Sequence, residues 1–228
     1  MPGSSDRIVR VDPVHPDPAA IGAAADCIRG GGVVVVPTRG LYGLGADALR
    51  PETVDRVFAV KGRPENKPVL VLISERATVD RLVAEASPLA RRLMDRFWPG
   101  RLTLVMPARP GLPEGLAAGT GTVGVRLCGH PVARALVAAV GGPVTGTSAN
   151  PSGGPGCDRI DRLDPSVDRR ADHILDAGPL AGGPGSTVVD VSGERPTVLR
   201  YGAVGPAELA AVFAEAGADF SEPASGRK

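Results

Sequence analysis

The stretch "KGRPENKPVLVLI", residues 61–73, joins a basic segment to an apolar one and decides how the rest of the chain is interpreted. Lys61, Arg63 and Lys67 lie close together in it, and the apolar run at 69–73 follows directly. A short, uninterrupted apolar run is typical of a strand that is buried on both faces. The stretch therefore predicts a buried strand with three cations at its edge.

Segments with helical and strand-like patterns alternate on both sides of this stretch. Apolar spacing, first-turn prolines and terminal glycines predict helices at 18–29, 51–61, 76–86, 88–97, 131–140 and 206–217. Short apolar or alternating runs predict strands at 33–36, 69–73, 102–106, 122–127, 143–147, 173–176, 186–191 and 197–201. The alternation predicts one α/β domain at 18–216, after an N-terminal extension (1–17) and before a flexible tail (217–228).

Composition narrows the class of protein. The chain has 228 residues, of which 43% are hydrophobic, enough for the core of one sizeable domain. Its formal net charge is +1, so any attraction for phosphate must be local. The first residues carry no apolar targeting segment, which predicts a cytoplasmic protein. Cys27, Cys128 and Cys157 are unclustered, which argues against a disulfide framework or a paired-cysteine zinc site.

Common catalytic motifs are missing from the sequence. It contains no GxxxxGK[ST], HExxH or GxSxG pattern. "GTGTVG" at 119–124 fits a dinucleotide fingerprint, but it runs into a predicted strand instead of opening a helix. Asp47 and Asp190 are weak candidates for holding Mg²⁺ through water, and no direct metal ligands are predicted. Surface or capping roles are expected for the isolated histidines, which are His15, His130 and His173.

Several predicted strands instead end in a cation or a hydroxyl next to glycine. In "TVGVRL", alternation places Arg126 on a face that Gly124 keeps small. Comparable ends occur in "VTGTSANPSGG" (144–154), "GGPGSTVVD" (182–190) and "TVLRYG" (197–202). Guanidinium groups and small donors that permit close approach are what a polyphosphate requires. Each cation alone also fits a solvated loop or a helix C-terminus, but their number favours a nucleotide site.

Six motifs in this order resemble the YrdC family, whose enzymes are threonylcarbamoyl-AMP synthases. They are "PTRGLYGLGADA" (37–48), "KGRPENKP" (61–68), "FWPGRLTLV" (97–105), "VGVRLCGHP" (123–131), "TGTSANPSG" (145–153) and "GSTVVD" (185–190). The resemblance covers roughly residues 18–205. It is to the single-domain form of the family. It implies an α/β fold of the α+β type, a twisted mixed β-sheet flanked by helices around a central basic cavity.

The resemblance also implies a reaction. L-Threonine, bicarbonate and ATP would give threonylcarbamoyl-AMP and pyrophosphate, and a partner would transfer the threonylcarbamoyl group to adenosine 37 of tRNA. Mg²⁺ is expected with ATP, without an identified protein ligand. The implied ATP-binding residues are Lys61, Arg63, Lys67, Thr122, Ser148, Asn150 and Arg200, with Lys61 and Arg63 also catalytic. The implied threonine- and bicarbonate-binding residues are Thr38, Gly40, Arg126, Thr147 and Ser186.

One loop departs from the family pattern. Relatives commonly read Pro-Thr-Asp/Glu-Thr-Val-Tyr-Gly-Leu, whereas residues 37–44 read "PTRGLYGL". Gly40 removes a hydroxyl, so selectivity for threonine over valine or serine is expected to weaken unless a neighbour substitutes. Arg39 inverts a charge and is a candidate for binding a carboxylate or a phosphate.

Two other functions remain open from the sequence. One is a YrdC-like relative that acts on a different amine or carbamoyl donor, which Gly40 favours. The other is a non-catalytic RNA-binding module that uses the same basic cavity. The low aromatic content of 3% and the small net charge count against the second.

Overall fold

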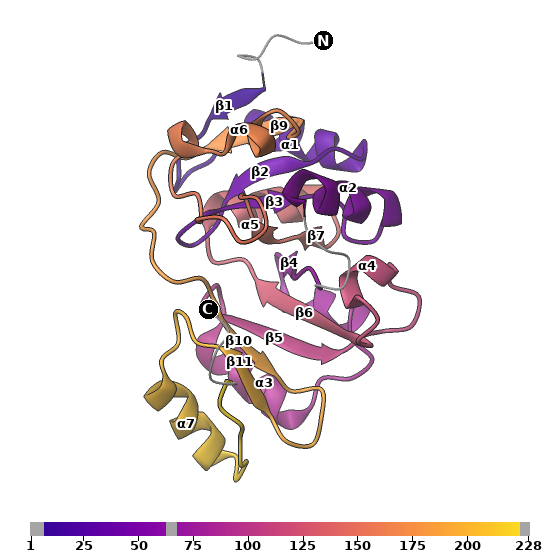
Figure 1. Cartoon of the computed structure of the whole chain (residues 1–228), viewed down its shortest axis with the longest axis vertical. Coiled ribbons are helices and arrows are strands. Elements are labelled where there is room, and N and C mark those ends of the chain that lie inside the picture. Colours follow the sequence, from indigo (N-terminus) through magenta and orange to yellow (C-terminus); the bar gives the residue numbers. More distant parts are fainter. Residues whose placement is uncertain (1–6, 63–67, 224–228) are drawn as a thin grey trace.

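The strands form two mixed sheets, stacked along the long axis of the molecule (Figure 1). The structure is a computed structural model that describes residues 7–62 and 68–223. The five-stranded sheet has the order β1 (Ile8–Arg10), β9 (His173–Asp176), β2 (Val34–Pro37), β3 (Tyr42–Gly45), β8 (Thr147–Ser148). The six-stranded sheet has the order β11 (Thr197–Arg200), β10 (Thr187–Asp190), β5 (Leu102–Pro107), β6 (Thr122–Leu127), β4 (Val71–Ile73), β7 (Val144–Thr145).

Helices accompany each sheet. Those near the five-stranded sheet are α1 (Pro18–Arg29), α2 (Pro51–Lys61), α5 (Pro131–Val140) and the short α6 (Pro165–Asp168). Those near the six-stranded sheet are α3 (Pro88–Phe97), the short α4 (Glu114–Ala117) and α7 (Pro206–Glu215). Helix α5 packs on α1 and also contacts both β2 and β4, so it links the two sheets. No described helix is both long and apolar enough to cross a membrane.

Local chemistry fixes where the helices begin. Asp17 accepts a hydrogen bond from the backbone N–H of Ala19, and Ser87 accepts one from Ala90, so each caps the helix that follows it. His130 caps α5 through its ring nitrogen, which confirms the expected capping role. Each of these helices also starts with proline, whose missing N–H costs nothing in the first turn.

The predicted α/β class is confirmed, and the helices at 18–29, 51–61, 88–97 and 131–140 have the predicted bounds. The strands, however, are divided between two sheets. The helix expected at 76–86 is only a short 3₁₀-helix, Arg76–Arg81, which lacks a side-chain cap at Glu75.

Strands β1 and β3 were not predicted, and the single strand predicted at 143–147 is divided between β7 and β8, which belong to different sheets. Strand β1 lies within the expected N-terminal extension and pairs with β9. Strand β3 has the sequence YGLG, whose glycines favour a loop, yet all four of its residues are buried against β2 and β8. The expected flexible tail is also anchored in part, since the rings of Phe213 and Phe220 pack 4.6 Å apart.

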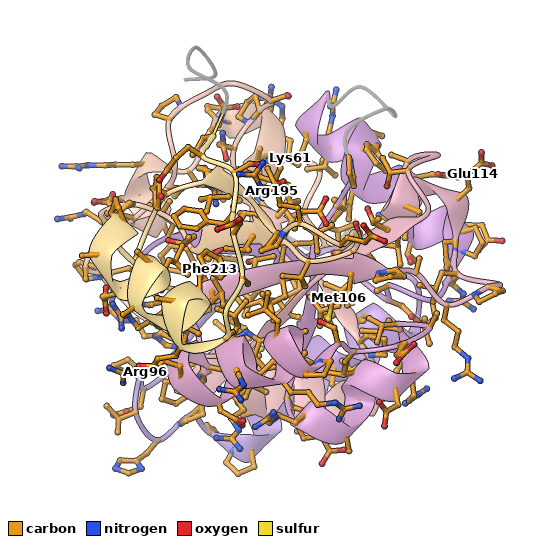
Figure 2. All side chains as sticks on the ribbon, turned by 90° about the horizontal axis from the view of Figure 1, so that it is seen from below. Lys61, Arg96, Met106, Glu114, Arg195 and Phe213 are labelled. Atoms are coloured by element: carbon orange, nitrogen blue, oxygen red, sulfur yellow. The ribbon has the colours of Figure 1, made fainter. Side chains whose placement is uncertain are left out.

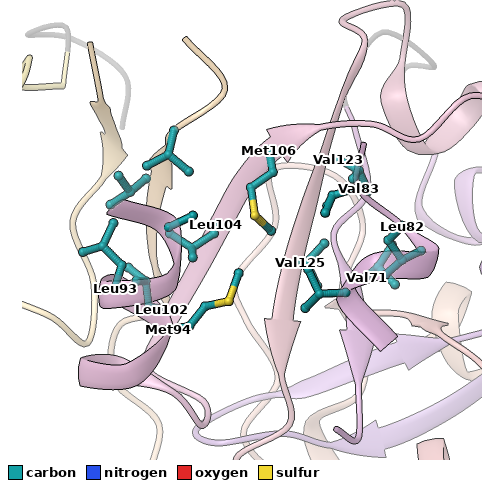
Figure 3. Close-up of a cluster of buried hydrophobic side chains, with 14 of the residues drawn as sticks. Val71, Leu82, Val83, Leu93, Met94, Leu102, Leu104, Met106, Val123 and Val125 are labelled. Atoms are coloured by element: carbon teal, nitrogen blue, oxygen red, sulfur yellow. The ribbon is translucent and has the colours of Figure 1, made fainter. Parts of the chain in front are cut away.

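The core of the six-stranded sheet lies on one face of its strands (Figure 3). Leu102, Leu104 and Met106 project from alternate positions of β5 toward α3, and Val123 and Val125 project from β6 beside them. All five side chains are fully buried. Figure 2 shows Met106 in the interior, whereas Arg96 and Glu114 extend outward. The opposite face of the same strands remains to form a site.

Candidate functional site

A cavity of about 440 Å³ opens over that opposite face. The floor of the cavity is the six-stranded sheet. The other walls come from the β2–β3 turn, from β8 with the loop after it, and from a glycine-rich segment before β10. Because side chains alternate along a strand, Thr103 and Val105 face the cavity while their neighbours on β5 face the core. The volume lies in the usual range for a site that binds a small molecule.

Among the described residues, three guanidinium groups line the cavity, from Arg39, Arg126 and Arg200, and no carboxylate does. Arg200 donates a hydrogen bond to the backbone oxygen of Ser186 at 2.8 Å, which holds it at the rim. A hollow with cations on its walls concentrates anions even when the whole molecule is almost neutral. The site is therefore suited to a phosphate- or carboxylate-bearing ligand.

Arg126 is the most constrained of these cations. Its side chain is only 8% exposed, and no described residue forms an ion pair or side-chain hydrogen bond with it. Burial lowers its pKa to about 10, and the nearby positive charges of Arg200 and Arg39 add to that effect. The group is still charged at neutral pH. A buried, uncompensated charge is costly, so this position favours an anionic ligand.

The loop after β8 is held in place by hydrogen bonds from the end of α2. Lys61, the last residue of α2, is 3% exposed and donates hydrogen bonds to the backbone oxygens of Ser148 and Asn150. The amide of Asn150 donates to the oxygens of Pro151 and Gly154. Its own Oδ1 is buried and has no hydrogen-bond partner among the described residues. A buried acceptor without a partner on the cavity wall is a candidate contact for a ligand donor.

Two hydroxyls meet on the cavity floor. Thr103 Oγ1 and Ser186 Oγ lie 2.7 Å apart, on residues that are 1% and 3% exposed. One hydrogen bond uses one of their two protons, so one donor is left for another acceptor. Thr103 was not among the predicted site residues. Its polar side chain between Leu102 and Leu104 is the sequence signal that indicates a face turned away from the core.

The glycine-rich segment at 177–186, here called the strap, connects β9 to β10 (Figure 1). Its residues Pro184, Gly185 and Ser186 line one side of the cavity. Gly182 N–H donates to the oxygen of Gly40 at 2.9 Å, and the hydroxyl of Tyr42 donates to the oxygen of Gly178 at 2.7 Å. A Cβ atom on Gly40 would lie 2.3 Å from the oxygen of Gly182. Glycine at position 40 is therefore required by the close approach of the strap.

Nine of the twelve predicted site residues line this cavity: Thr38, Gly40, Thr122, Arg126, Thr147, Ser148, Asn150, Ser186 and Arg200. Lys61 does not line it, because its ammonium group is turned to the backbone of the 148–150 segment. Its predicted phosphate contact stays a prediction. Arg63 and Lys67 lie outside the described residues.

The suggested water-mediated Mg²⁺ positions do not face the cavity. Asp47 accepts a hydrogen bond from the N–H of Leu49, and Asp190 accepts hydrogen bonds from Ser192, so both carboxylates cap local turns. Across residues 7–62 and 68–223, no group of three or more His, Cys, Asp or Glu residues is arranged to hold a metal ion.

Known proteins are similar to this chain in sequence and in fold. Residues 26–202 match the sequence profile of the Sua5/YciO/YrdC family, which carries the description "Telomere recombination". The threonylcarbamoyl-AMP synthase of Bacillus subtilis is 37% identical over 194 residues, which cover 85% of this chain and 56% of that protein. The threonylcarbamoyl-AMP synthase of Methylococcus capsulatus is 35% identical over 174 residues, covering 75% of this chain and 93% of the relative.

A solved structure agrees with these matches. The structure of Sua5 from Pyrococcus abyssi complexed with L-threonine superposes with a TM-score of 0.88 at 33% identity, covering 94% of this chain and 62% of that one. The chain thus spans little more than half the length of the Bacillus subtilis relative but nearly all of the Methylococcus capsulatus one.

Fold and site together define a class: α/β proteins with an arginine-lined cavity over one face of a mixed sheet. Within that class, the matched residues and the shared fold identify the family. The chain belongs to the Sua5/YciO/YrdC family.

Proposed function

We propose that this protein is a threonylcarbamoyl-AMP synthase, which converts L-threonine, bicarbonate and ATP into threonylcarbamoyl-AMP and pyrophosphate. The observation that carries the proposal is the cavity of about 440 Å³, on whose walls residues 7–62 and 68–223 place three guanidinium groups and no carboxylate. The names of the Bacillus subtilis and Methylococcus capsulatus relatives, and the L-threonine in the Pyrococcus abyssi structure, support the same substrates.

The reaction asks little of a protein base. The amine of threonine forms a C–N bond with the carbon of bicarbonate as a C–O bond breaks; the hydroxide lost and a proton of the amine leave as water, and a carbamate results. If CO₂ is the acceptor, a C=O π bond opens instead and the amine proton passes to solvent. A carbamate oxygen then bonds to the α-phosphorus of ATP as the bond to the leaving pyrophosphate breaks. Positioned cations stabilise the charge that moves onto the leaving group, and a narrow cavity limits hydrolysis of the carbamate. This chemistry fits a cavity with arginines and hydroxyls on its walls.

The walls suggest how the substrates are divided. We assign the nucleotide to Thr122, Arg200 and the Ser148–Asn150 segment, where the unpartnered Oδ1 of Asn150 can accept a hydrogen bond from a base or ribose donor. The amino acid and bicarbonate are assigned to the part of the cavity bounded by Thr38, Gly40, Arg126, Thr147 and Ser186. Lys61 then acts as a positioning residue that holds the 148–150 segment.

The wider roles belong to the same proposal. Mg²⁺ would enter with the phosphates of ATP. The product would serve threonylcarbamoyladenosine formation at position 37 of tRNA in the cytoplasm, through a separate transfer partner.

The test is bicarbonate-dependent release of pyrophosphate from ATP with each amino acid supplied in turn. Threonine is expected to give the highest rate, and the rate should fall to the blank without bicarbonate. Threonine at the level of the blank would overturn the assignment, and a higher rate with another amine would favour the alternative substrate. Arg63→Ala is expected to abolish release without lowering the melting temperature.

A further inference from the structure

A small recess adjoins the main cavity where the two sheets meet. Its volume is about 10 Å³, enough for at most one water molecule. Gly100 and Gly129 line the recess, and their backbones approach closely, since a Cβ atom on Gly100 would lie 2.9 Å from the Cα of Gly129. Arg39 and Arg126 line both the recess and the main cavity, so their guanidinium groups stand at the junction of the two hollows.

These two arginines come from different sheets. Arg39 lies in the turn between β2 and β3 of the five-stranded sheet, and Arg126 lies in β6 of the six-stranded sheet. In the described part of the chain, neither forms an ion pair with a carboxylate. Two like charges held near each other repel, and an anion between them removes that repulsion.

The site is built for its charge rather than left open by chance. The side chain of Arg126 is more than nine-tenths buried and has no side-chain partner among the described residues. The aliphatic part of Arg39 runs past Gly100, where a Cβ atom would lie 3.6 Å from Arg39 Cδ. That contact places the aliphatic part of Arg39, which is an exposed residue, beside Gly100 at the edge of the recess.

We propose that Arg39 joins Arg126, already assigned to the amino-acid end of the cavity, in one subsite for the carboxylate of the amino-acid substrate, and that Arg39 sets the requirement for that carboxylate. The inference rests on the proposed function, which supplies the amino acid. A planar carboxylate offers two oxygens to two guanidinium forks. The nucleotide is assigned to Thr122, Arg200 and the Ser148–Asn150 segment, which leaves the carboxylate as the anion for this pair.

The kinetic experiment compares wild type with Arg39→Met, Arg39→Lys and the control Arg92→Met. Arg92 is an exposed residue of α3 that does not line either hollow. Arg39→Met is expected to raise KM for threonine about tenfold and to leave KM for ATP unchanged, because a charged hydrogen bond is lost only to the carboxylate. Arg39→Lys should recover part of the loss, and Arg92→Met should behave as wild type.

Two kinetic outcomes would overturn the inference. A rise in KM for ATP with KM for threonine unchanged would show that Arg39 binds phosphate. Unchanged values for both substrates would show that Arg39 belongs to no subsite.

A binding experiment separates this inference from the proposed function. L-Threonine and L-threoninamide, which lacks the carboxylate, are titrated into wild type and Arg39→Met by calorimetry, so no turnover is needed. Wild type is expected to prefer threonine, and Arg39→Met should lose about tenfold of that preference. An equal preference for threonine over threoninamide in the two proteins would overturn the carboxylate subsite, even if pyrophosphate is released. Preference without pyrophosphate release supports the subsite and contradicts the proposed reaction.

Discussion

The two faces of the six-stranded sheet are built from the same strands and have opposite chemistry. On one face, Leu104, Met106 and Val125 are fully buried in apolar contacts. On the other, Thr103 and Arg126 stand in a cavity. Burial of the first face lowers the free energy of the folded state. The second face buries a charge that has no described partner, which raises it.

Stability of the fold and binding of the ligand therefore depend on alternate residues of the same strand. A substitution on the core face should therefore change the free energy of unfolding, and one on the cavity face should change turnover. Four predictions, from the largest expected effect to the smallest, test that separation.

Leu104→Ala is expected to reduce the free energy of unfolding by about 3 to 4 kcal/mol, because it removes buried apolar atoms and leaves a void. Urea denaturation measures the loss. Val14→Ala is the control, since Val14 is an exposed residue and should change stability by less than about 0.5 kcal/mol. The remaining folded protein should keep its kcat/KM for threonine. A large drop in that value would show that the two faces are not independent.

Arg126→Met is expected to act in the opposite sense. It should lower kcat/KM about 100-fold, close to 2.7 kcal/mol, because the anion loses its buried partner. It should also raise the free energy of unfolding by about 1 to 3 kcal/mol, since burial in the fold lowers the pKa of Arg126 to about 10.

The sign of that stability change follows from the direction of the pKa shift. A cation with a lowered pKa destabilises the fold at every pH below about 10, and the penalty fades as pH rises from there toward the ordinary pKa of arginine. Replacing the charge should therefore raise the melting temperature at pH 7. A lower melting temperature would mean that the guanidinium stabilises the fold.

Gly40→Ala tests the contact between the strap and the β2–β3 turn. The added Cβ would lie 2.3 Å from the oxygen of Gly182, so the strap must move, at a cost of about 1 to 2 kcal/mol. Thermal denaturation gives the cost, and KM for threonine should rise. Gly22→Ala is the matched control, because a Cβ there meets no atom within 4 Å. Equal stability of the two variants would contradict the close approach.

Thr103→Val should have the smallest effect. The change keeps the shape of the side chain and removes the hydroxyl that pairs with Ser186. The preference for L-threonine over L-valine is expected to fall about threefold to tenfold, since about 1 kcal/mol of hydrogen bonding is lost. Competition assays of pyrophosphate release measure that ratio. Thr197→Val on β11 is the control, and a matching fall there would assign the change to the sheet instead of the hydroxyl pair.

Residues with strong local signals were predicted well. Pro18, Pro88 and Pro131 each start a helix where the sequence places it, because caps and first-turn prolines act within a few residues. Strand β3 was missed because its glycines favour a loop when its partners β2 and β8 are not known. Thr103 was missed because its place between two leucines indicates only a face turned away from the core, whereas its hydroxyl pair with Ser186 depends on a contact between distant segments.

The sequence by itself determined the α/β class, the helix starts, and the kinds of residues that bind an anion, because these depend on local spacing and side-chain chemistry. Only the tertiary structure decided the division into two sheets, the inward turn of the Lys61 ammonium and the pairing of Arg39 with Arg126 at one recess. Contacts between residues far apart in the chain depend on how whole elements pack. That packing is a balance of many weak terms summed over the molecule, and no short stretch of sequence contains it.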